Sequence, residues 1–390
     1  TGDAGNILEN IADRHPVKAV FWNRLYDKSS TKRDTDIKTT LQDHGLICES
    51  FKANLLFEPW EVKTGAGTDF KVYSPFWRAC QKQPSPRAPL KAPESLTISD
   101  IHIDGEVDLA TFDLGPKPFD WATGFAERFT PGEQGAKDQL FDFIDDRLCD
   151  YADLRDRPDH QVTSELSPHL RFGEISPYQV WHAANHFADA NPGKGKTAAK
   201  FISELGWREF SHHTLFHAKD LRNVPLQANF KHCPWAEDED TLHRWQRGQT
   251  GFPIVDAGMR QLWQTGWMHN RLRMVAAMFL SKHLLIDWRW GEKYFMQHLI
   301  DGDFSANNGG WQWSASTGTD SVPYFRVFNP VTQSKRFDAE GDFIRRFVPE
   351  LQELDKKIIH EPGLFKPEQY PLPVIDLKFG RERALNAFRG

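Results

Sequence analysis

Several features are scarce in this sequence of 390 residues, and each scarcity excludes a class of protein. The four cysteines, Cys48, Cys80, Cys149 and Cys233, show no Cys-x-x-Cys spacing, which argues against a disulfide framework and a zinc site. No segment reaches the roughly 18 uncharged apolar residues that a membrane helix requires. The opening residues resemble neither a secretory signal nor a transit peptide. We therefore expect a cytoplasmic protein with reduced thiols, no bound metal and no membrane contact.

Positive charge is also scarce overall, but it is unevenly distributed. The formal net charge is −6, which by itself disfavours a nucleic-acid partner. Residues 91–160 hold 17 acidic and 7 basic side chains, whereas the other residues hold 37 acidic and 41 basic ones. The rest of the chain can therefore form a local basic face, which is what phosphate binding needs. The charge pattern permits DNA binding without requiring it.

Aromatic side chains, in contrast, are abundant. The chain holds 14 Trp, 29 Phe and 7 Tyr, which make up 13% of its residues, and most of them must be buried. Two tryptophans stand one residue apart in DGDFSANNGGWQWSASTGTD (301–320). In an extended segment, Trp311 and Trp313 would point to opposite sides. We expect one of them to face the core and the other a cleft.

The first 81 residues carry the pattern of a small α/β unit. VKAVFWN (17–23) is an apolar run typical of a buried strand, and LICESF (46–51) resembles a second strand. DTDIKTTLQDHGL (34–46) has the spacing of an amphipathic helix that ends at Gly45. We predict an α/β layer over residues 1–81 that is too small for a complete sheet.

The remaining chain divides into a connector and a helical domain. Residues 82–118 contain six prolines, so we predict a surface connector there. Beyond it the apolar period is helical, and the predicted helices are 137–154, 176–189 with Ser176 as cap and Pro177 in the first turn, 196–218 and 269–285. The predicted fold class is an α/β N-terminal domain followed by a large all-α domain over residues 119–390.

Three hydroxyl side chains precede a proline that can open a helix. Thr163, Ser164 and Ser167 lie in QVTSELSPHLRFGEISP (161–177). Hydroxyls beside the free N–H groups of a helix N-terminus suit a phosphate, although most such clusters are plain helix caps. Both interpretations are open from spacing alone.

A second candidate site lies in ISELGWREF (202–210). Glu204, Trp207 and Arg208 share one helix face, since they stand at i, i+3 and i+4. An acid, a large aromatic and a base on one face can form a ligand surface. The alternative is an intrahelical Glu–Arg pair beside a core tryptophan.

A third candidate site lies in TGWMHNRLRM (265–274). Asn270, Arg273 and Met274 share a face, and Arg271 is turned about 100° away. Two arginines that point in different directions can bind two anions, or one of them is solvated. Arg326 adds a cation among the aromatics of YFRVFNP (324–330).

Two other patterns carry little weight. His213 and His217 stand at i, i+4, but no glutamate follows the first histidine as in a zincin, so we expect no metal there. TGAGT (64–68) lacks the strand-to-helix context of a dinucleotide loop.

The order and spacing of these motifs resemble the photolyase/cryptochrome flavoprotein family over nearly the whole chain. The motifs that carry this resemblance, between residues 245 and 350, are WQRGQTGFPIVDAGMRQL, GWMHNRLRM, LIDWRWGEKYF and DGDFSANNGGWQWSASTGTD. The sequence is most similar to microbial photolyases that repair cyclobutane pyrimidine dimers. The resemblance implies a carbon–carbon lyase that uses blue light to transfer an electron from fully reduced FAD to a dimer flipped out of UV-damaged DNA.

The resemblance also implies the residues that hold FAD in the helical domain. On the phosphate side they are Tyr151, Thr163, Ser164, Leu166 and Ser167. Around the rest of the cofactor they are Phe201, Arg208, Asn270, Arg273, Asp301, Asp303 and Asn307. Asn307 matches the position beside flavin N5, where an asparagine favours fully reduced flavin and plant cryptochromes have an aspartate.

Catalytic and substrate-binding roles follow from the same resemblance. Trp311, Trp288 and Trp235 match a chain that passes electrons from the surface to the flavin. Glu204 matches the carboxyl that contacts the pyrimidine edge and stabilises its radical anion, with help from Asn270. The residues implied to bind the dimer and its flanking phosphates are Arg155, Glu204, Trp207, Arg271, Met274, Trp313 and Arg326. We expect a monomer with little sequence specificity and salt-dependent affinity for DNA.

Three rival functions are weighed against repair of these dimers. A cryptochrome-type blue-light photoreceptor is the main alternative, and Asn307 with the set Glu204, Trp207, Met274 and Trp313 argues against it. Repair of six-four photoproducts is disfavoured because Asn270 follows His269, where those enzymes resemble a paired-histidine pattern. A single-strand DNA-binding module would need no flavin and would be colourless.

An antenna chromophore is a further implication of the resemblance. Folate, as methenyltetrahydrofolate, is the first expectation and a deazaflavin the second. Asn23 and Tyr26 lie in the stretch comparable to the antenna-binding segment. The family's opening strand, with its Arg-x-Asp-Leu-Arg-type motif, has no counterpart here, so the α/β domain is expected to be incomplete at its start.

Overall fold

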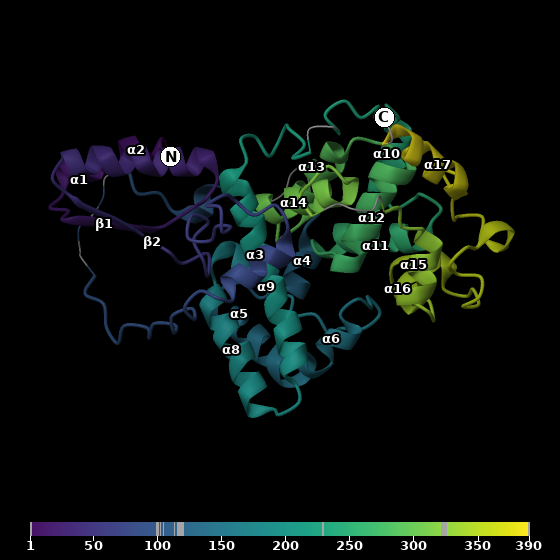
Figure 1. The fold of residues 1–390 in the computed structure, drawn as a ribbon, viewed down its shortest axis with the longest axis horizontal. Coiled ribbons are helices and arrows are strands. Elements are labelled where there is room, and N and C mark those ends of the chain that lie inside the picture. The colour runs from purple at the N-terminus through teal and green to yellow at the C-terminus, as the bar shows by residue number, and fades with distance from the viewer. Residues whose placement is uncertain are drawn as a thin grey trace.

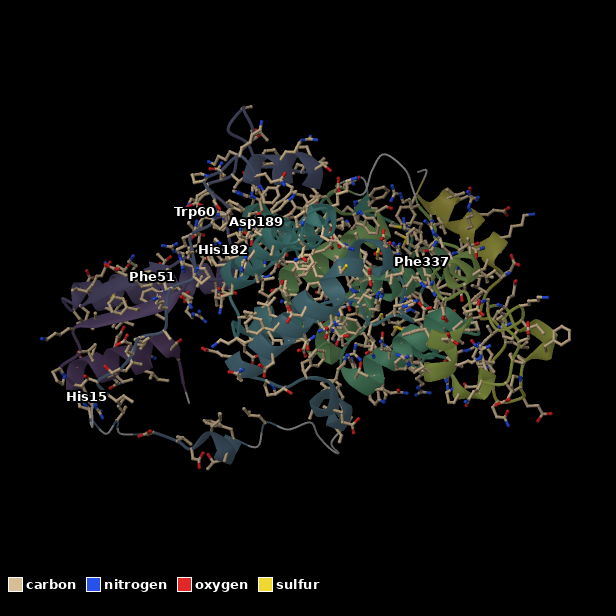
Figure 2. The ribbon with its side chains drawn as sticks, turned by 90° about the horizontal axis from the view of Figure 1, so that it is seen from below. His15, Phe51, Trp60, His182, Asp189 and Phe337 are labelled. Atoms are coloured by element: carbon tan, nitrogen blue, oxygen red, sulfur yellow. The ribbon has the colours of Figure 1, made fainter. Side chains whose placement is uncertain are left out.

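The computed structural model describes residues 2–98, 101, 103, 105–112, 114, 121–227, 230–320 and 326–388. A small N-terminal unit lies at one end of a larger helical body (Figure 1). From a second direction, Phe51 lies in the N-terminal unit, Phe337 in the helical body, and Trp60 near their junction (Figure 2). This arrangement agrees with the predicted order of an α/β part followed by an all-α part.

The N-terminal unit is built on two parallel strands. β1 (Ala19–Asn23) pairs with β2 (Ile47–Phe51) in the register Ala19↔Ile47 to Asn23↔Phe51. Parallel strands need a crossover, and α2 (Lys28–Asp43) supplies it, with α1 (Ala4–Arg14) packed against α2. The predicted strands are confirmed. The predicted helix begins earlier than residue 34 because the Asp27 carboxylate accepts the N–H of Ser30 and caps it.

The helical body contains the remaining α-helices of the described chain. They are α3 (Tyr73–Cys80), α4 (Thr123–Arg128), α5 (Glu133–Asp142), α6 (Tyr151–Leu154), α7 (Ser167–Phe172), α8 (Pro177–Ala190), α9 (Gly195–His217), α10 (Glu239–Gln246), α11 (Pro253–Thr265), α12 (Asn270–Met278), α13 (Trp288–His298), α14 (Phe304–Ala315), α15 (Pro330–Phe337), α16 (Asp342–Phe347) and α17 (Leu377–Ala387). Among these described helices, none combines the length and apolar character needed to cross a membrane.

Two of the predicted helices are confirmed almost to the residue. α8 begins at Pro177, and Ser176 forms a reciprocal capping box with Gln179, as the motif indicates. α9 spans 23 residues and packs against α6, α8 and α14. The long helix α9 therefore lies at the centre of the body, where its side chains reach several neighbours.

The helix predicted over residues 137–154 is wrong as a single element. α5 ends at Asp142, and a π-helical turn and a 3-10 turn intervene before α6. Phe143 and Leu148 are both fully buried, yet five residues of a regular α-helix would turn them about 140° apart. The wider π turn brings both side chains to the same core. A second π turn, over residues 279–283, likewise follows α12 in the predicted helix 269–285.

Two apolar clusters form the core on either side of α9. One joins α11, α12, α13 and α14, and the other joins α3, α5, α8 and α9. The described part of the predicted connector is largely exposed, with a short 3-10 turn at Leu109–Phe112. The expectation that Trp311 and Trp313 lie in an extended segment is wrong, because both belong to α14. Residues i and i+2 of an α-helix are turned about 200° from each other, so the side chains of the two tryptophans still point in different directions.

Candidate functional site

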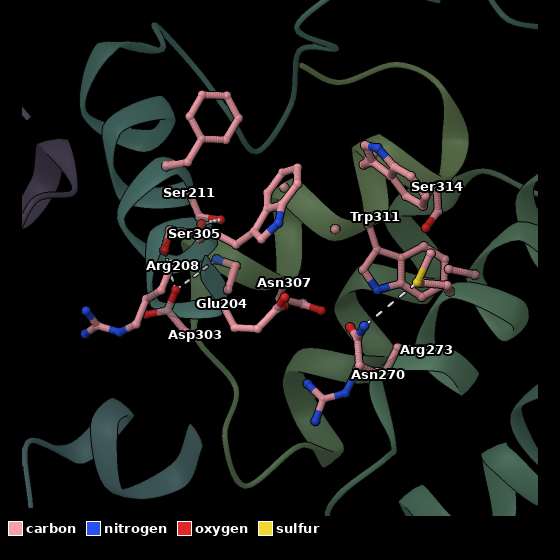
Figure 3. A pocket seen from close by; sticks show the side chains of 18 of the residues that line it. Glu204, Arg208, Ser211, Asn270, Arg273, Asp303, Ser305, Asn307, Trp311 and Ser314 are labelled. Carbon is pink, nitrogen blue, oxygen red and sulfur yellow. Dashed lines mark hydrogen bonds between the residues drawn. The ribbon is translucent and has the colours of Figure 1, made fainter. Parts of the chain in front are cut away.

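A cavity of about 870 Å³ lies among α9, α12 and α14 in the helical body (Figure 3). It brings together residues that are far apart in the sequence. The predicted site residues that line it are Arg155, Ser167, Glu204, Trp207, Arg208, Asn270, Arg271, Arg273, Met274, Asp301, Asp303, Asn307, Trp311, Trp313 and Arg326. The second and third candidate sites of the sequence therefore belong to one cavity, and Ser167 of the first site reaches it.

Helix α14 forms one wall, and its first turn is fixed by a cap. The Asp303 carboxylate accepts the N–H of Ala306 at 2.9 Å and also accepts a hydrogen bond from the Ser305 hydroxyl. Farther along the helix, a Cβ atom at Gly310 would meet no heavy atom within 4 Å. No side chain covers the backbone of α14 at Gly310, so a flat ligand can approach the backbone closely there.

Asn307 follows on the same helix with its amide oriented by α13. Its Nδ2 donates to the carbonyl oxygen of Glu292 at 2.9 Å. Because the nitrogen is engaged there, the side-chain oxygen is left as an acceptor toward the cavity (Figure 3). This geometry suits a ligand N–H such as N5–H of a reduced flavin.

Buried groups around Asp303 keep that carboxylate ionised. Burial raises its pKa, but His212, the Ser305 hydroxyl and the N–H of Ala306 together lower the pKa to about 2. His212 itself has a lowered pKa because it is buried. The negative charge at the start of α14 also interacts favourably with the helix dipole.

A second carboxylate, Asp301, ties together three segments of the wall. It accepts hydrogen bonds from Ser167 Oγ at 2.6 Å and from Arg273 Nη2 at 2.8 Å. Arg273 Nε also donates to the carbonyl oxygen of Met268 at 2.7 Å. These contacts hold Arg273 against the cavity and bring Ser167, at the first position of α7, beside it.

The intrahelical Glu204–Arg208 pair considered as an alternative does not form. Arg208 donates to the carbonyl oxygen of Asn54, in the segment after β2. Glu204 instead accepts from Arg155, which follows α6, and lies 3.4 Å from Lys200 Nζ. Burial lowers the pKa of Arg155, but its hydrogen bond to Glu204 raises the pKa above the ordinary value.

Trp207 stands at the cavity wall on a support that the sequence analysis missed. Its ring stacks on Tyr73 with centroids 3.7 Å apart and planes inclined by 10°. Tyr73 belongs to α3, and its hydroxyl donates to the carbonyl oxygen of Ser203 at 2.7 Å. No local signal in YSPFWRAC indicates this role, because the two rings are distant in the sequence.

Several predicted FAD residues lie behind the wall and do not line the cavity. Tyr151, Leu166 and Phe201 are buried in the apolar cluster of α5, α8 and α9, where Tyr151 and Phe201 meet edge to face. Thr163 and Ser164 use their carbonyl oxygens to accept hydrogen bonds from Arg147 and Gln139. Of the three hydroxyls noted in the sequence, Ser167 is the one that reaches the cavity.

The three tryptophans of the expected electron chain share one apolar cluster. Trp311 and Trp288 are 2% and 1% exposed, and Trp235 packs against the cluster that contains them. Of these three, Trp311 lines the cavity. Trp311 also contacts Trp245 and Phe295, with ring centroids 6.0 Å and 4.9 Å away. The order of electron flow remains a prediction.

The cavity has the donor set that a flavin dinucleotide requires. Arg208 and Arg273 bring positive charge to the cavity, which suits phosphates, and Asn307 brings an acceptor oxygen. Within the described chain, the buried oxygens Asp301 Oδ1 and Thr214 Oγ1 have no hydrogen-bond partner, although both residues line the cavity. Buried polar atoms seldom stay unpaired, so they fit a polar ligand. The described residues contain no cluster that could hold a metal ion.

A second, smaller cavity of about 280 Å³ lies where the N-terminal unit meets the helical body. Trp22, Trp60, Arg24, Lys38 and Tyr26 are among its lining residues. Of the two residues in the stretch comparable to the antenna-binding segment, Tyr26 lines this cavity, whereas Asn23, at the end of β1, does not. The two tryptophans were not singled out in the sequence.

The fold and the larger cavity define a protein whose helical body holds a polar cavity with an aromatic wall, suited to a dinucleotide. Residues 201–390 match the family model described as the FAD binding domain of DNA photolyase, and residues 1–94 match the DNA photolyase model. The chain belongs to the photolyase/cryptochrome family.

Individual relatives agree with this assignment. The deoxyribodipyrimidine photo-lyase of Agrobacterium fabrum is 45% identical over 403 residues, which cover 100% of this chain and 83% of that protein. A bacterial class III photolyase from Agrobacterium tumefaciens has a similar solved structure, with a TM-score of 0.94, 45% identity and coverage of 100% and 82%. An archaeal photolyase from Sulfolobus tokodaii, solved with two FAD molecules, has a TM-score of 0.83, 29% identity and the same coverage.

Proposed function

We propose that the protein is a deoxyribodipyrimidine photo-lyase, an enzyme that uses light and reduced FAD to split cyclobutane pyrimidine dimers in UV-damaged DNA. The observation that carries this proposal is the single large cavity, which joins a dinucleotide donor set to an aromatic wall and a carboxylate. The named relatives are photo-lyases, and this favours repair over the cryptochrome-type photoreceptor.

The cofactor is proposed to lie between α9, α12 and α14. Arg208, Arg273 and Ser167 would bind its polar parts, and Asn307 would accept a hydrogen bond from the flavin ring. Bound FAD supplies the light-driven one-electron chemistry, which no amino-acid side chain can provide. Tyr151, Leu166 and Phe201 would support this wall from behind, and Thr163 and Ser164 would act near the phosphates through their main chain and hydroxyls.

The dimer is proposed to enter the same cavity from the side of Trp207. Flipping a base out of the duplex costs a few kcal/mol, and stacking on an aromatic ring offsets about 1–3 kcal/mol per base. Trp207 is held rigid by its stack on Tyr73, and Trp313 and Met274 would complete the apolar walls. Glu204 and Asn270 would bind the polar edge of the pyrimidines. Arg155, Arg271 and Arg326 would contact the flanking phosphates.

Electron supply to the cofactor is proposed to pass through Trp235, Trp288 and Trp311. The shared apolar cluster supports this path, because Trp311 and Trp288 belong to it and the partly exposed Trp235 packs against it. Asn307 would favour the fully reduced flavin by accepting a hydrogen bond from N5–H. Its amide orientation, fixed by Glu292, supports that role.

An antenna chromophore is proposed for the smaller cavity, with a folate first and a deazaflavin second. Trp22 and Trp60 offer rings on which a flat pterin can stack, and Arg24 and Lys38 offer charge for a glutamyl carboxylate. These features favour the folate. Releasing the bound chromophore by denaturation and recording its absorption and mass would distinguish the two compounds.

We also propose the division into an antenna-type unit at residues 1–81, a connector at 82–118 and a FAD-binding domain at 119–390, with α3, at the end of the first unit, packed into the helical body. The four free cysteines support a reducing compartment, such as the cytoplasm. A monomer would leave the cavity mouth open to DNA.

The decisive experiment is blue-light-dependent loss of cyclobutane dimers from a UV-irradiated thymine oligonucleotide under reducing conditions. We expect repair in the light and none in a matched dark sample. A yellow, photoreducible protein that repairs nothing would instead indicate a photoreceptor. A colourless protein that binds the oligonucleotide would indicate a binding module.

A further inference from the structure

The mouth of the larger cavity carries an acidic residue, Asp156, whose position suggests a role of its own. Asp156 Oδ2 lies 2.6 Å from Arg271 Nη2, and its other oxygen lies 3.8 Å from Arg155 Nε. All three side chains line the cavity. Asp156 therefore pairs closely with Arg271 and lies near Arg155, and both arginines are proposed to bind DNA phosphates.

An aromatic ring also contacts the guanidinium group of Arg271. Its guanidinium lies 4.4 Å from the ring centroid of Phe337, at the end of α15. The Arg271 side chain is only 15% exposed, whereas that of Asp156 is 37% exposed. A half-exposed carboxylate can turn into solvent at little cost, so a phosphate can replace it beside Arg271.

The pairing affects undamaged and damaged DNA differently. Undamaged duplex binds mainly through its phosphates, and each phosphate that a cation neutralises releases counterions, which favours binding. A cation that is kept away from the phosphates therefore weakens the binding of undamaged DNA. A flipped dimer gains additional stacking inside the cavity, and its flanking phosphate is brought to the mouth. Specificity is the difference between the affinity for damaged DNA and the affinity for undamaged DNA. A residue that weakens only the binding of undamaged DNA therefore increases specificity.

We propose that Asp156 is a specificity-determining residue, which withholds Arg271 from undamaged DNA until the phosphate beside a flipped dimer displaces it. The inference rests on the proposed repair function and goes beyond it, because it assigns a role to an acidic residue at a phosphate-binding mouth. Asp156 lies two residues after the end of α6, and within the described chain its ion-pair partners are the two arginines.

The test is the substitution Asp156→Asn in the FAD-loaded protein, with binding measured in the dark. The probes are one oligonucleotide with a single thymine cyclobutane dimer and the same oligonucleotide without it, over a series of salt concentrations. We expect affinity for undamaged DNA to rise roughly threefold and affinity for the dimer to change much less. The slope of log K against log salt for undamaged DNA should become steeper by about 0.9.

Asp153→Asn is the matched control, because Asp153 is exposed on α6 and its loss changes net charge equally. We expect this control to leave the ratio of the two affinities unchanged. Asp156→Glu keeps the charge and should retain the wild-type ratio. The inference is overturned if Asp156→Asn does not lower the ratio of dimer affinity to undamaged-DNA affinity. It is also overturned if Asp153→Asn lowers this ratio equally. Wild-type protein with no preference for the dimer contradicts the proposed function itself.

Discussion

At the scale of single residues, the cavity is a set of charged side chains that are each held by a partner from another element. Asp301 holds Arg273 and Ser167, and Glu204 holds Arg155. Such pairs fix the direction of each side chain before a ligand binds, which lowers the ordering cost of binding. Their individual contributions to stability are small, since most are partly exposed.

Glu204→Gln should separate catalysis from binding. The amide has the same shape, but it replaces the carboxyl group that contacts Arg155 and would contact the pyrimidine edge with a neutral group, whose hydrogen bonds are weaker than charged ones by about 1 kcal/mol. We expect several-fold fewer dimers repaired per absorbed photon and little change in dimer affinity. Quantum-yield and dark-binding measurements check this, with Glu133→Gln on the exposed surface of α5 as the control. Equal quantum yields in wild type and Glu204→Gln would refute the catalytic role.

At the scale of elements, helices α13 and α14 meet through a glycine. A Cβ atom at Gly291 would lie 2.1 Å from the ring of Trp311, so this contact depends on the missing side chain. The close approach brings the ring of Trp311 against the backbone of α13, the helix that begins with Trp288. The spacing of two members of the expected electron chain therefore depends on one glycine.

Gly291→Ala should disturb both stability and photoreduction. Overpacking of this kind lowers the free energy of unfolding by about 1–3 kcal/mol, and it must move Trp311 or α13. Urea unfolding and the rate of flavin photoreduction under steady blue light check the two effects. Gly195→Ala at the open start of α9 is the control, since a Cβ there meets nothing within 4 Å. A variant as stable and as readily photoreduced as wild type would show that the contact has no such role.

Helix α9 also ties the helical body to the segment after β2 through a buried acid. Glu209 accepts the N–H groups of Leu56 and Phe57 at 2.9 Å and 3.0 Å. Burial raises its pKa from 4.5 to about 7, despite the nearby Arg208 and these hydrogen bonds. Between pH 4.5 and about pH 7, the carboxyl group of Glu209 therefore takes up a proton when the protein folds.

This proton uptake predicts a pH dependence. The contribution of Glu209 to the free energy of unfolding is largest below about pH 4.5 and declines until about pH 7, by up to about 3 kcal/mol. Glu209→Gln should remove this decline, so the difference between wild type and variant should change with pH over that window. Urea unfolding at several pH values measures it, beside the exposed control Glu127→Gln. Parallel profiles for wild type and Glu209→Gln would contradict the assignment.

At the scale of the whole molecule, the large cavity lies between the two apolar clusters that make up the core. A ligand there contacts α9, α12 and α14 together, and it binds the folded state alone. Such binding stabilises a protein by about 2.7 kcal/mol when free ligand is 100-fold above its Kd.

Removal of FAD should therefore lower the Tm, and added FAD should restore it in a concentration-dependent way. Riboflavin should restore less, because it lacks the phosphates and the adenosine that the charged wall would bind. Thermal unfolding of flavin-free and reloaded protein checks both statements. A Tm that does not change when FAD is removed would show that the cavity does not hold it.

Much of the fold could be predicted from the sequence because it depends on neighbours along the chain. Ser176 caps the helix that begins one residue later, and the apolar period of residues 196–218 is that of α9. Most of the site residues that the family resemblance implied do line the cavity. The π turn at residues 143–147 could not be predicted, because the burial of Phe143 and Leu148 by distant helices causes it.

The sequence by itself determined several of the helices, the two strands and the kinds of side chain available for a flavin and for DNA. These properties follow from interactions within a few residues, such as caps and amphipathic periods. Only the tertiary structure decided that Glu204 pairs with Arg155 instead of Arg208, that Trp207 stacks on Tyr73, and that Asp156 covers Arg271. The physical reason is that each of these contacts joins residues from different elements, and packing of the whole core sets which of them meet.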